Sequence, residues 1–308
     1  MIMENEEKPR SVLLIGVQDA GKTNFLSRFW LNLEAGGGIL TKAGLPADLD
    51  YLKTGGDHLL KGEFAPHTPQ DVHDRTEIPV KATASGTEFS GKLVVPDLPG
   101  EQVLSVFRTR QWSDAWENQI RAGCGCLLFV RVDSPELIAP LDWMNCPTLF
   151  GMPVPEAAPQ KDPADRLKPP TQVVLVDWLQ FLRKAFTDKV GGRYKPRIGI
   201  VVAAWDLAPV DQKGNGPEAW VRANLPLLWQ FVQTNDDAFE FAYFGVSVAS
   251  GDLAADPAFK ASYLKGDPLR AGEVIHSIAG TLETSADITL PVAWALGVTG
   301  TSNNGSGN

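Results

Sequence analysis

The run from Gly16 to Thr23, GVQDAGKT, has the residue types and spacing of a phosphate-binding loop. Its glycines let the backbone turn so that N–H groups point at phosphate oxygens, and the following helix adds the positive end of its dipole. We expect Lys22 to reach the β- and γ-phosphates and Thr23 to ligate Mg²⁺. A chance match in a turn is the alternative. The candidate nucleotide-binding residues here are Gly16, Gln18, Asp19, Ala20, Gly21, Lys22, Thr23 and Asn24.

A second motif, Asp97-Leu98-Pro99-Gly100, follows a predicted strand over residues 92–96. An aspartate at the tip of that strand can hold Mg²⁺ through water, and Gly100 can offer its backbone N–H to the γ-phosphate. D-x-x-G alone is weak evidence because Asp, Pro and Gly are ordinary turn residues. Its place after an apolar strand and downstream of the phosphate loop strengthens the prediction of a nucleotide site.

Two further strands are predicted to end beside the same site. Residues 198–206, IGIVVAAWD, read as a buried parallel strand that ends in Asp206. Ligands bind at the carboxyl ends of such strands, where a carboxylate can accept hydrogen bonds from N1–H and the 2-amino group of guanine. A turn or helix N-cap aspartate is the alternative. Residues 241–250 form the other strand, whose end can close over the base with backbone N–H groups of Ser247, Val248 and Ala249.

The motifs GVQDAGKT, DLPG, WD and SVAS occur in this order, and the chain resembles the Ras-like (TRAFAC-class) branch of the P-loop GTPases. With the phrase LKGEFAPHTPQD it looks most like the bacterial double-GTPase families. The resemblance implies GTP and GDP as ligands, Mg²⁺ as cofactor, and Thr68 as the threonine that closes on the metal and the γ-phosphate. It also implies a molecular switch that hydrolyses GTP to GDP in a bacterial multi-component signalling or conflict system. A protein partner, an effector or an activating protein, is expected at the switch regions and insertions.

Two positions depart from the Ras-like pattern. Ala203-Ala204-Trp205-Asp206 stands where Ras-like proteins carry Asn-Lys-x-Asp, so the lysine that packs over the base is absent and we expect weaker base binding. Trp205 either replaces part of that packing or belongs to the core. Glu101 replaces the glutamine that orients water, and Gln102 follows one place later. The catalytic candidates are Lys22, Thr68, Glu101 and Gln102, and Arg108 and Arg110 either contact the transition state or lie on a solvated helix face.

Two alternatives stay open. An ionised Glu101 repels the γ-phosphate, so either Gln102 substitutes or a partner completes a slow site. The first alternative is a pseudo-GTPase, which binds nucleotide without significant hydrolysis and acts as a scaffold. The second alternative is an ATPase of unrelated biology; if Asp206 does not read the base, the chain is an ATPase or a phosphate binder that does not distinguish bases.

The elements that must position these residues alternate as in an α/β fold. Strands are expected over residues 12–15, 77–84, 92–96, 127–132, 198–206 and 241–250, and helices over 24–33, 48–61, 102–122, 172–185, from 217, from 226, over 270–284 and over 290–296. They predict a P-loop NTPase three-layer sandwich of about six mostly parallel strands with one antiparallel edge strand. We expect one GTPase domain over residues 11–299, with insertions near 39–67, 135–171 and 251–270 and tails at 1–10 and 300–308.

Composition narrows the function classes. The chain has 308 residues, 44% of them hydrophobic, a formal net charge of −9 and a sequence pI near 5.0. That charge disfavours sequence-independent binding to nucleic acid and to acidic membranes. Three cysteines suit neither a disulfide scaffold nor, with scattered histidines, a zinc site. No apolar run is long enough to cross a bilayer and the start lacks a signal peptide, so we expect a cytoplasmic protein.

Overall fold

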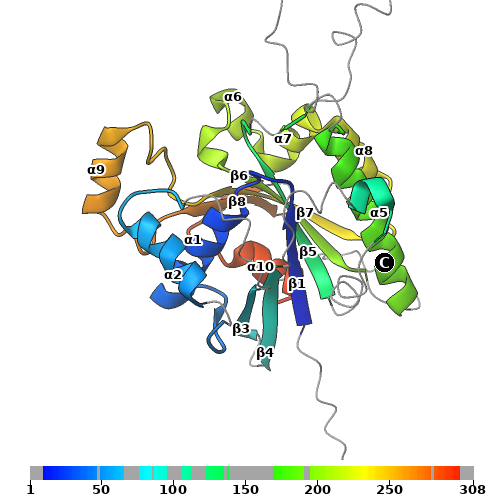
Figure 1. Cartoon of the computed structure of the whole chain (residues 1–308), viewed down its shortest axis with the longest axis horizontal. Helices are drawn as coiled ribbons and strands as arrows, with labels where there is room; N and C mark the ends of the chain where they lie inside the picture. Colours follow the sequence, from blue (N-terminus) through cyan, green and yellow to red (C-terminus); the bar gives the residue numbers. More distant parts are fainter. Residues whose placement is uncertain are drawn as a thin grey trace, which may run out of the picture.

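The computed structural model describes residues 10–46, 49–65, 76–84, 87–95, 106–111, 123–134, 137–138, 169–190, 195–278 and 281–298 (Figure 1). Its strands are β1 (Arg10–Gly16), β2 (Thr41–Lys42), β3 (Thr76–Ala84), β4 (Thr87–Val95), β5 (Gly123–Arg131), β6 (Arg197–Ala203), β7 (Glu240–Ser247), β8 (Glu273–Ile278) and β9 (Thr281–Ser285). Its labelled helices are α1 (Lys22–Ala35), α2 (Leu49–Leu60), α5 (Thr171–Val190), η4 (Trp205–Leu207), α6 (Val210–Lys213), α7 (Gly216–Asn224), α8 (Pro226–Gln233), α9 (Pro257–Lys265) and α10 (Leu290–Leu296).

These strands form one sheet in the order β2-β3-β4-β1-β5-β6-β7-β8-β9. The central strands β4, β1, β5, β6 and β7 are parallel to one another. On both sides the sheet continues with antiparallel strands, β3 and β2 on one side and β8 and β9 on the other. The mixed α/β architecture with a parallel centre is as predicted. The prediction of about six strands with one antiparallel edge strand was wrong, because the described residues contain a nine-stranded sheet with antiparallel pairing at both edges.

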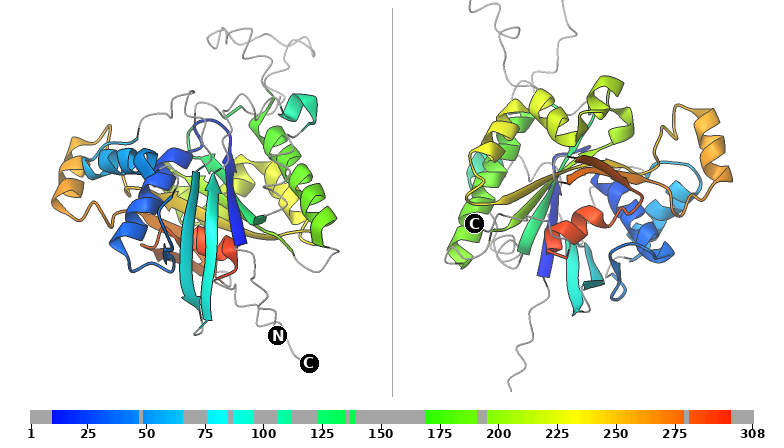
Figure 2. Two further views of the ribbon diagram at one scale, coloured as in Figure 1. Left: turned by 60° about the horizontal axis from the view of Figure 1, so that its bottom comes forward. Right: turned by 180° about the vertical axis from the view of Figure 1, so that it is seen from behind.

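Side chains of the parallel strands alternate between two apolar layers, as the period of a strand requires. Val12 and Leu14 of β1 belong to a core cluster with residues of α1, α2 and α10, while Leu13 and Ile15 belong to a cluster with α5, α7 and α8. Figure 1 and both views of Figure 2 show these two groups of helices on opposite faces of the sheet. Both faces are covered, which explains why the central strands read as continuous apolar runs.

Most element predictions agree with the structure. α2 matches the helix expected over residues 48–61, and β3 and β4 form the antiparallel pair that was expected. The predicted break between two helices before Pro226 is also present, between α7 and α8. The helix predicted over residues 270–284 was wrong, since β8 and β9 occupy that region. Of the helix predicted over 102–122, only residues 106–111 are described, and residues 106–109 are helical. Among the described residues, no helix is long and apolar enough to cross a membrane.

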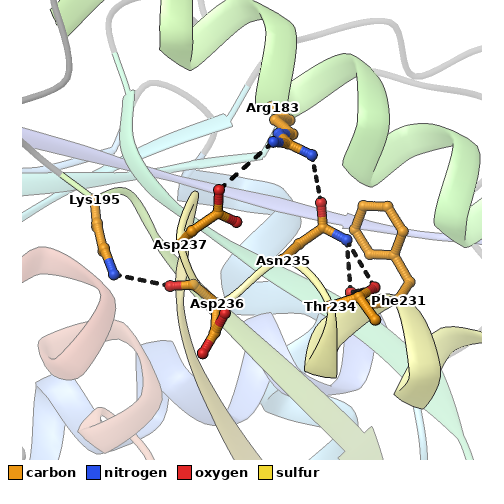
Figure 3. Close-up of polar contacts among 7 residues, drawn as sticks. All are labelled: Arg183, Lys195, Phe231, Thr234, Asn235, Asp236 and Asp237. Carbon is orange, nitrogen blue, oxygen red and sulfur yellow. Dashed lines mark hydrogen bonds and ion pairs between the residues drawn. The ribbon is translucent and has the colours of Figure 1, made fainter.

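Side chains fix the turn between α8 and β7, at the end of the sheet opposite the carboxyl ends of the parallel strands (Figure 3). Asn235 donates from Nδ2 to the carbonyl oxygen of Phe231 at 2.8 Å, which satisfies an acceptor in the last turn of α8. Its Oδ1 accepts a hydrogen bond from Arg183 of α5 at 2.7 Å, and Arg183 also pairs with Asp237 at 3.8 Å. The start of β7 is thus anchored to α5.

Candidate nucleotide-binding site

A cavity of about 370 Å³ lies where β1, β5, β6 and β7 end. It brings together three of the predicted motifs: the phosphate loop after β1, the segment after β6, and the segment after β7. Its lining residues are Asp19, Ala20, Gly21, Lys22, Thr23, Asn24, Phe64, Ala65, Arg131, Ala203, Ala204, Asp206, Leu207, Val248, Asp252 and Ala254. Convergence of polar groups in one cavity at the carboxyl ends of parallel strands is typical of a ligand site.

The phosphate loop has backbone conformations that its sequence favours. Gly21 has a φ of +86°, and a Cβ there would lie 2.9 Å from the Cβ of Ala203, so a side chain would be both strained and crowded. Asp19 also has a positive φ, +58°, a region where aspartate is enriched among non-glycine residues. The loop therefore turns tightly against the end of β6, and α1 begins directly at Lys22.

Lys22 is held by the backbone of its own loop. Its Nζ donates to the carbonyl oxygen of Gly16 at 2.7 Å and to that of Val17 at 2.8 Å. Burial lowers the pKa of Lys22 to about 8, an effect partly opposed by the nearby Asp19 carboxylate. The site thus contains a cation that is poorly solvated and whose charged form would be stabilised by an anionic ligand.

The two residues after Lys22, in the first turn of α1, contact α2 and the segment that follows it. The Thr23 hydroxyl oxygen accepts a hydrogen bond from the Tyr51 hydroxyl of α2 at 3.2 Å. Asn24 accepts from the backbone N–H of Ala65 at 2.8 Å through Oδ1. Phe64 and Ala65 therefore complete one wall of the cavity, directly before the predicted switch segment.

A buried arginine of α1 connects α2 and α9, which lie in two of the three segments predicted to be insertions, 39–67 and 251–270. Arg28 is fully buried, and its Nη2 lies 2.5 Å from the Tyr263 hydroxyl of α9. That hydroxyl donates to the carbonyl oxygen of Leu59 in α2 at 3.0 Å. Figures 1 and 2 show α9 at the periphery next to α2. The contact fixes the two helices whose flanking residues, Ala65 and Ala254, line the cavity.

Asp206 lies on the cavity wall just after β6. The chain leaves the strand through Ala204, which has a φ of +53°, and enters the short helix η4. Lys213 donates to the backbone carbonyl oxygen of Asp206 at 2.7 Å rather than to its carboxylate. Among the described residues, no hydrogen-bond or ion-pair partner is found for that half-buried carboxylate, which leaves it available to a ligand.

Trp205 belongs to the core and does not line the cavity. Its side chain is 1% exposed and belongs to the same core cluster as Trp220 of α7. A Cβ added to Gly245 of β7 would lie 2.6 Å from Cδ2 of the Trp205 ring, so this close approach requires glycine. Of the two roles considered for Trp205, packing in the core is the one that this geometry favours. The ring supports the segment that carries Asp206 from behind.

The end of β7 contributes one of its three predicted residues to the cavity wall. Val248 lines the cavity, whereas the side chains of Ser247 and Ala249 are buried. Asp252 follows in the same wall, and its Oδ1 accepts hydrogen bonds from the backbone N–H groups of Ala254 and Ala255 at 2.8 and 2.9 Å. This carboxylate shapes the loop before α9.

Sequence reasoning missed the partner of Asp19. Arg131, the last residue of β5, donates from Nη1 to Asp19 Oδ1 at 2.7 Å, and the Ser134 hydroxyl donates to Oδ2 at 3.0 Å. A carboxylate in a phosphate loop is expected to have a cationic partner, and this expectation was the signal that the sequence offered. Which cation supplies it depends on the parallel pairing of β1 with β5, which brings the loop after Gly16 beside the end of β5 and which the sequence alone does not show.

Several predicted site residues lie elsewhere. Gly16 and Gln18 belong to the phosphate loop but do not line the cavity. Arg110 pairs with Asp177 of α5, and Arg108 is exposed. The remaining predicted residues fall outside the residues that the structure describes, so their roles stay predictions: Thr68, Asp97, Gly100, Glu101 and Gln102.

The comparison with family models agrees with the motifs. A family model described as Double-GTPase 1 matches residues 13–295. No curated protein matches the chain. Among solved structures, the chain is similar to one described as the structure of Methanosarcina barkeri Roco2 RocCORdC bound to GDP, with 12% sequence identity, 83% of this chain covered and 47% of that chain. The chain thus spans about half the length of that protein, and the TM-score of 0.30 is too low to support an argument about fold or ligand.

Proposed function

The chain belongs to the double-GTPase 1 family, and from that premise we propose that it binds GTP and GDP in the cavity between the phosphate loop and Asp206. One observation carries the proposal: the same cavity is lined by Lys22 and Thr23 at one part of its wall and by Asp206 at another. The first pair suits phosphate groups, and the free carboxylate suits the N1–H and 2-amino edge of guanine.

The phosphate end of the cavity has the donors that a di- or triphosphate needs. Loop N–H groups and the N-terminus of α1 supply partial positive charge, and Lys22 supplies a full charge that the backbone carbonyls of Gly16 and Val17 already orient. The Thr23 hydroxyl oxygen, on the cavity wall and in contact with Tyr51, fits a ligand of Mg²⁺. Asp97 and Thr68 are the proposed further ligands, and the ion would neutralise charge on the β- and γ-phosphates.

The proposed reaction is hydrolysis of GTP to GDP, with catalysis by positioning and electrostatic stabilisation. In it, Lys22 stabilises negative charge on the phosphates, and Gln102 or Glu101 orients water. The wall formed by Phe64 and Ala65 leads into the segment that carries Thr68, which supports a switch that responds to the γ-phosphate. A protein partner that reads this switch is part of the proposal.

A second candidate, a guanine-nucleotide-binding scaffold that does not hydrolyse GTP, is favoured by one feature. Glu101 stands where Ras-like proteins have a glutamine, and an ionised carboxylate there repels the γ-phosphate. Steady-state phosphate release from GTP, with the purified chain alone and with candidate partners, separates the two. Release that Lys22→Met abolishes supports the enzyme, and binding without release under all conditions supports the scaffold.

The experiment that tests nucleotide identity uses the purified chain. Nucleotide released by heat is identified by chromatography, and GDP and ADP then compete against a fluorescent GDP analogue. We expect guanine nucleotides in the released fraction and displacement by GDP at far lower concentration than by ADP. Equal displacement by the two would overturn the assignment of Asp206 as the base reader.

A further inference from the structure

We propose that Arg131 is the residue against which the guanine base stacks, and that Asp19 holds its guanidinium in place. The proposal rests on the proposed function, since it places the base beside Asp206. It assigns a binding role to a residue of β5, whereas the guanine-reading segment, residues 203–206, lies at and just after the end of β6. In that segment, alanines replace the asparagine and lysine of the Ras-like pattern.

The position of Arg131 follows from strand pairing. Arg131 ends β5, and its partner in the parallel register with β6 is Ala203. Ala203, Ala204 and Arg131 all line the cavity, as does Asp206 a short distance along the chain. The two alanines contribute only methyl groups, so the arginine is the cationic side chain that this part of the wall offers among the described residues.

The guanidinium is oriented before any ligand arrives. Arg131 Nη1 lies 2.7 Å from Asp19 Oδ1, and the Ser134 hydroxyl holds Oδ2 at 3.0 Å. The Asp19 side chain is 13% exposed and that of Arg131 is 34% exposed, so the carboxylate is the buried anchor and part of the arginine remains accessible. An arginine held in this way loses little further side-chain entropy on binding a ligand.

The two ends of the cavity differ in chemistry, and this difference favours a contact of Arg131 with the base over a contact with the phosphates. Lys22 and the loop N–H groups already serve the phosphates, and one edge of the Arg131 guanidinium is committed to Asp19. What remains is a planar, weakly hydrated cationic face, which suits stacking on an aromatic ring. The pair also neutralises Asp19, whose charge would otherwise repel phosphate groups.

The test measures binding of GDP, GTP and pyrophosphate by competition against a fluorescent GDP analogue. Removing Arg131 alone would leave the Asp19 carboxylate without its ion-pair partner, so Arg131→Ala is compared with wild type and also within an Asp19→Asn background. Arg222→Ala is the matched control, because Arg222 lies over the Trp229 ring and outside the cavity lining. Lys22→Met shows how the loss of a phosphate contact changes the affinities for GDP, GTP and pyrophosphate.

In the Asp19→Asn background, we expect Arg131→Ala to weaken GDP and GTP equally, by about 3- to 30-fold, and to leave pyrophosphate affinity unchanged. Lys22→Met should weaken pyrophosphate as well. If the Arg131→Ala loss extends to pyrophosphate, Arg131 contacts phosphate. If no loss remains once Asp19 is neutral, Arg131 serves only to neutralise that carboxylate. Either result overturns the stacking proposal. A wild-type chain that binds ADP as well as GDP overturns the proposed function instead.

Discussion

The Lys22 ammonium lies 2.7 Å from the carbonyl oxygen of Gly16, inside the loop that precedes it. The buried cation therefore has backbone dipoles, together with the nearby Asp19 carboxylate, to stabilise its charge. Exchange of the carbonyl dipoles for phosphate oxygens would bring full negative charge to a poorly solvated ammonium. That exchange is the physical basis that we propose for phosphate binding in this chain.

Lys22→Met should weaken GDP and GTP binding by at least about tenfold, because a charge-assisted hydrogen bond to a buried group contributes about 1.5–3 kcal/mol. The fold should persist, since the substitution removes a poorly solvated charge rather than an apolar contact. Lys53→Met, on the exposed surface of α2, is the control. Calorimetric affinity equal to that of wild type would refute the phosphate site, and global unfolding would make Lys22 a structural residue.

Nucleotide affinity should depend on pH through Lys22. Burial lowers the pKa of its ammonium to about 8, and a neighbouring phosphate must raise that pKa again. Binding therefore takes up a proton above about pH 8, so affinity is constant below that pH and falls as the pH rises, by up to about tenfold per unit. The Lys22→Met variant has no such group and should show a flatter profile. Identical profiles for the two proteins would mean that Lys22 does not titrate on binding.

Gly245→Ala should disturb the segment that carries Asp206. The new Cβ would lie 2.6 Å from the Trp205 ring, and overpacking of this kind costs about 1–3 kcal/mol of unfolding free energy. Because Asp206 follows Trp205 directly, the preference for GDP over ADP should fall as well. Gly214→Ala is the matched control, since no atom lies within 4 Å of a Cβ built there. If the variant is destabilised but its nucleotide preference is unchanged, the packing of Trp205 does not contribute to base recognition.

Thr68→Ala should spare GDP binding and lower the Mg²⁺-dependent preference for a GTP analogue by about tenfold or more, because in the proposed switch the Thr68 hydroxyl would meet the metal and γ-phosphate only in the triphosphate state. Thr54→Ala provides the control, as Thr54 lies exposed on α2. Affinity ratios that match wild type would show that another residue closes on the γ-phosphate.

Local patterns predicted the part of the site that consists of one continuous segment. β1, the loop and α1 follow from an apolar run, two glycines and a Lys-Thr pair, all within residues 12–35. Asp206 was predicted for a similar reason, as a polar residue at the end of an apolar strand. By contrast, the partnership of Arg131 with Asp19 depends on which strands are neighbours, and the place of Trp205 depends on the space left by Gly245.

The antiparallel edge was predictable in principle. In the sequence, the short runs EVIHSI (273–278) and TLETS (281–285) are separated by two residues that include Gly280, a spacing that is typical of a β-hairpin. Branched residues such as Val274 and Ile275 also favour strands over helices. The helix predicted over residues 270–284 gave these signals too little weight. The wall formed by Phe64 and Asp252 could not be predicted in this way, because it arises where α2 and α9 pack against α1.

The most direct test of the account exchanges the base that the cavity accepts. Asp206→Asn replaces an acceptor with an NH₂ donor, which mismatches the 2-amino group of guanine and matches the carbonyl that xanthine carries there. We predict that GDP and GTP bind more weakly by about 2–4 kcal/mol, roughly thirty- to a thousand-fold, while xanthosine diphosphate gains relative to GDP. If affinity and base preference are both unchanged, Asp206 does not read the base, and the account of a guanine-nucleotide site is contradicted.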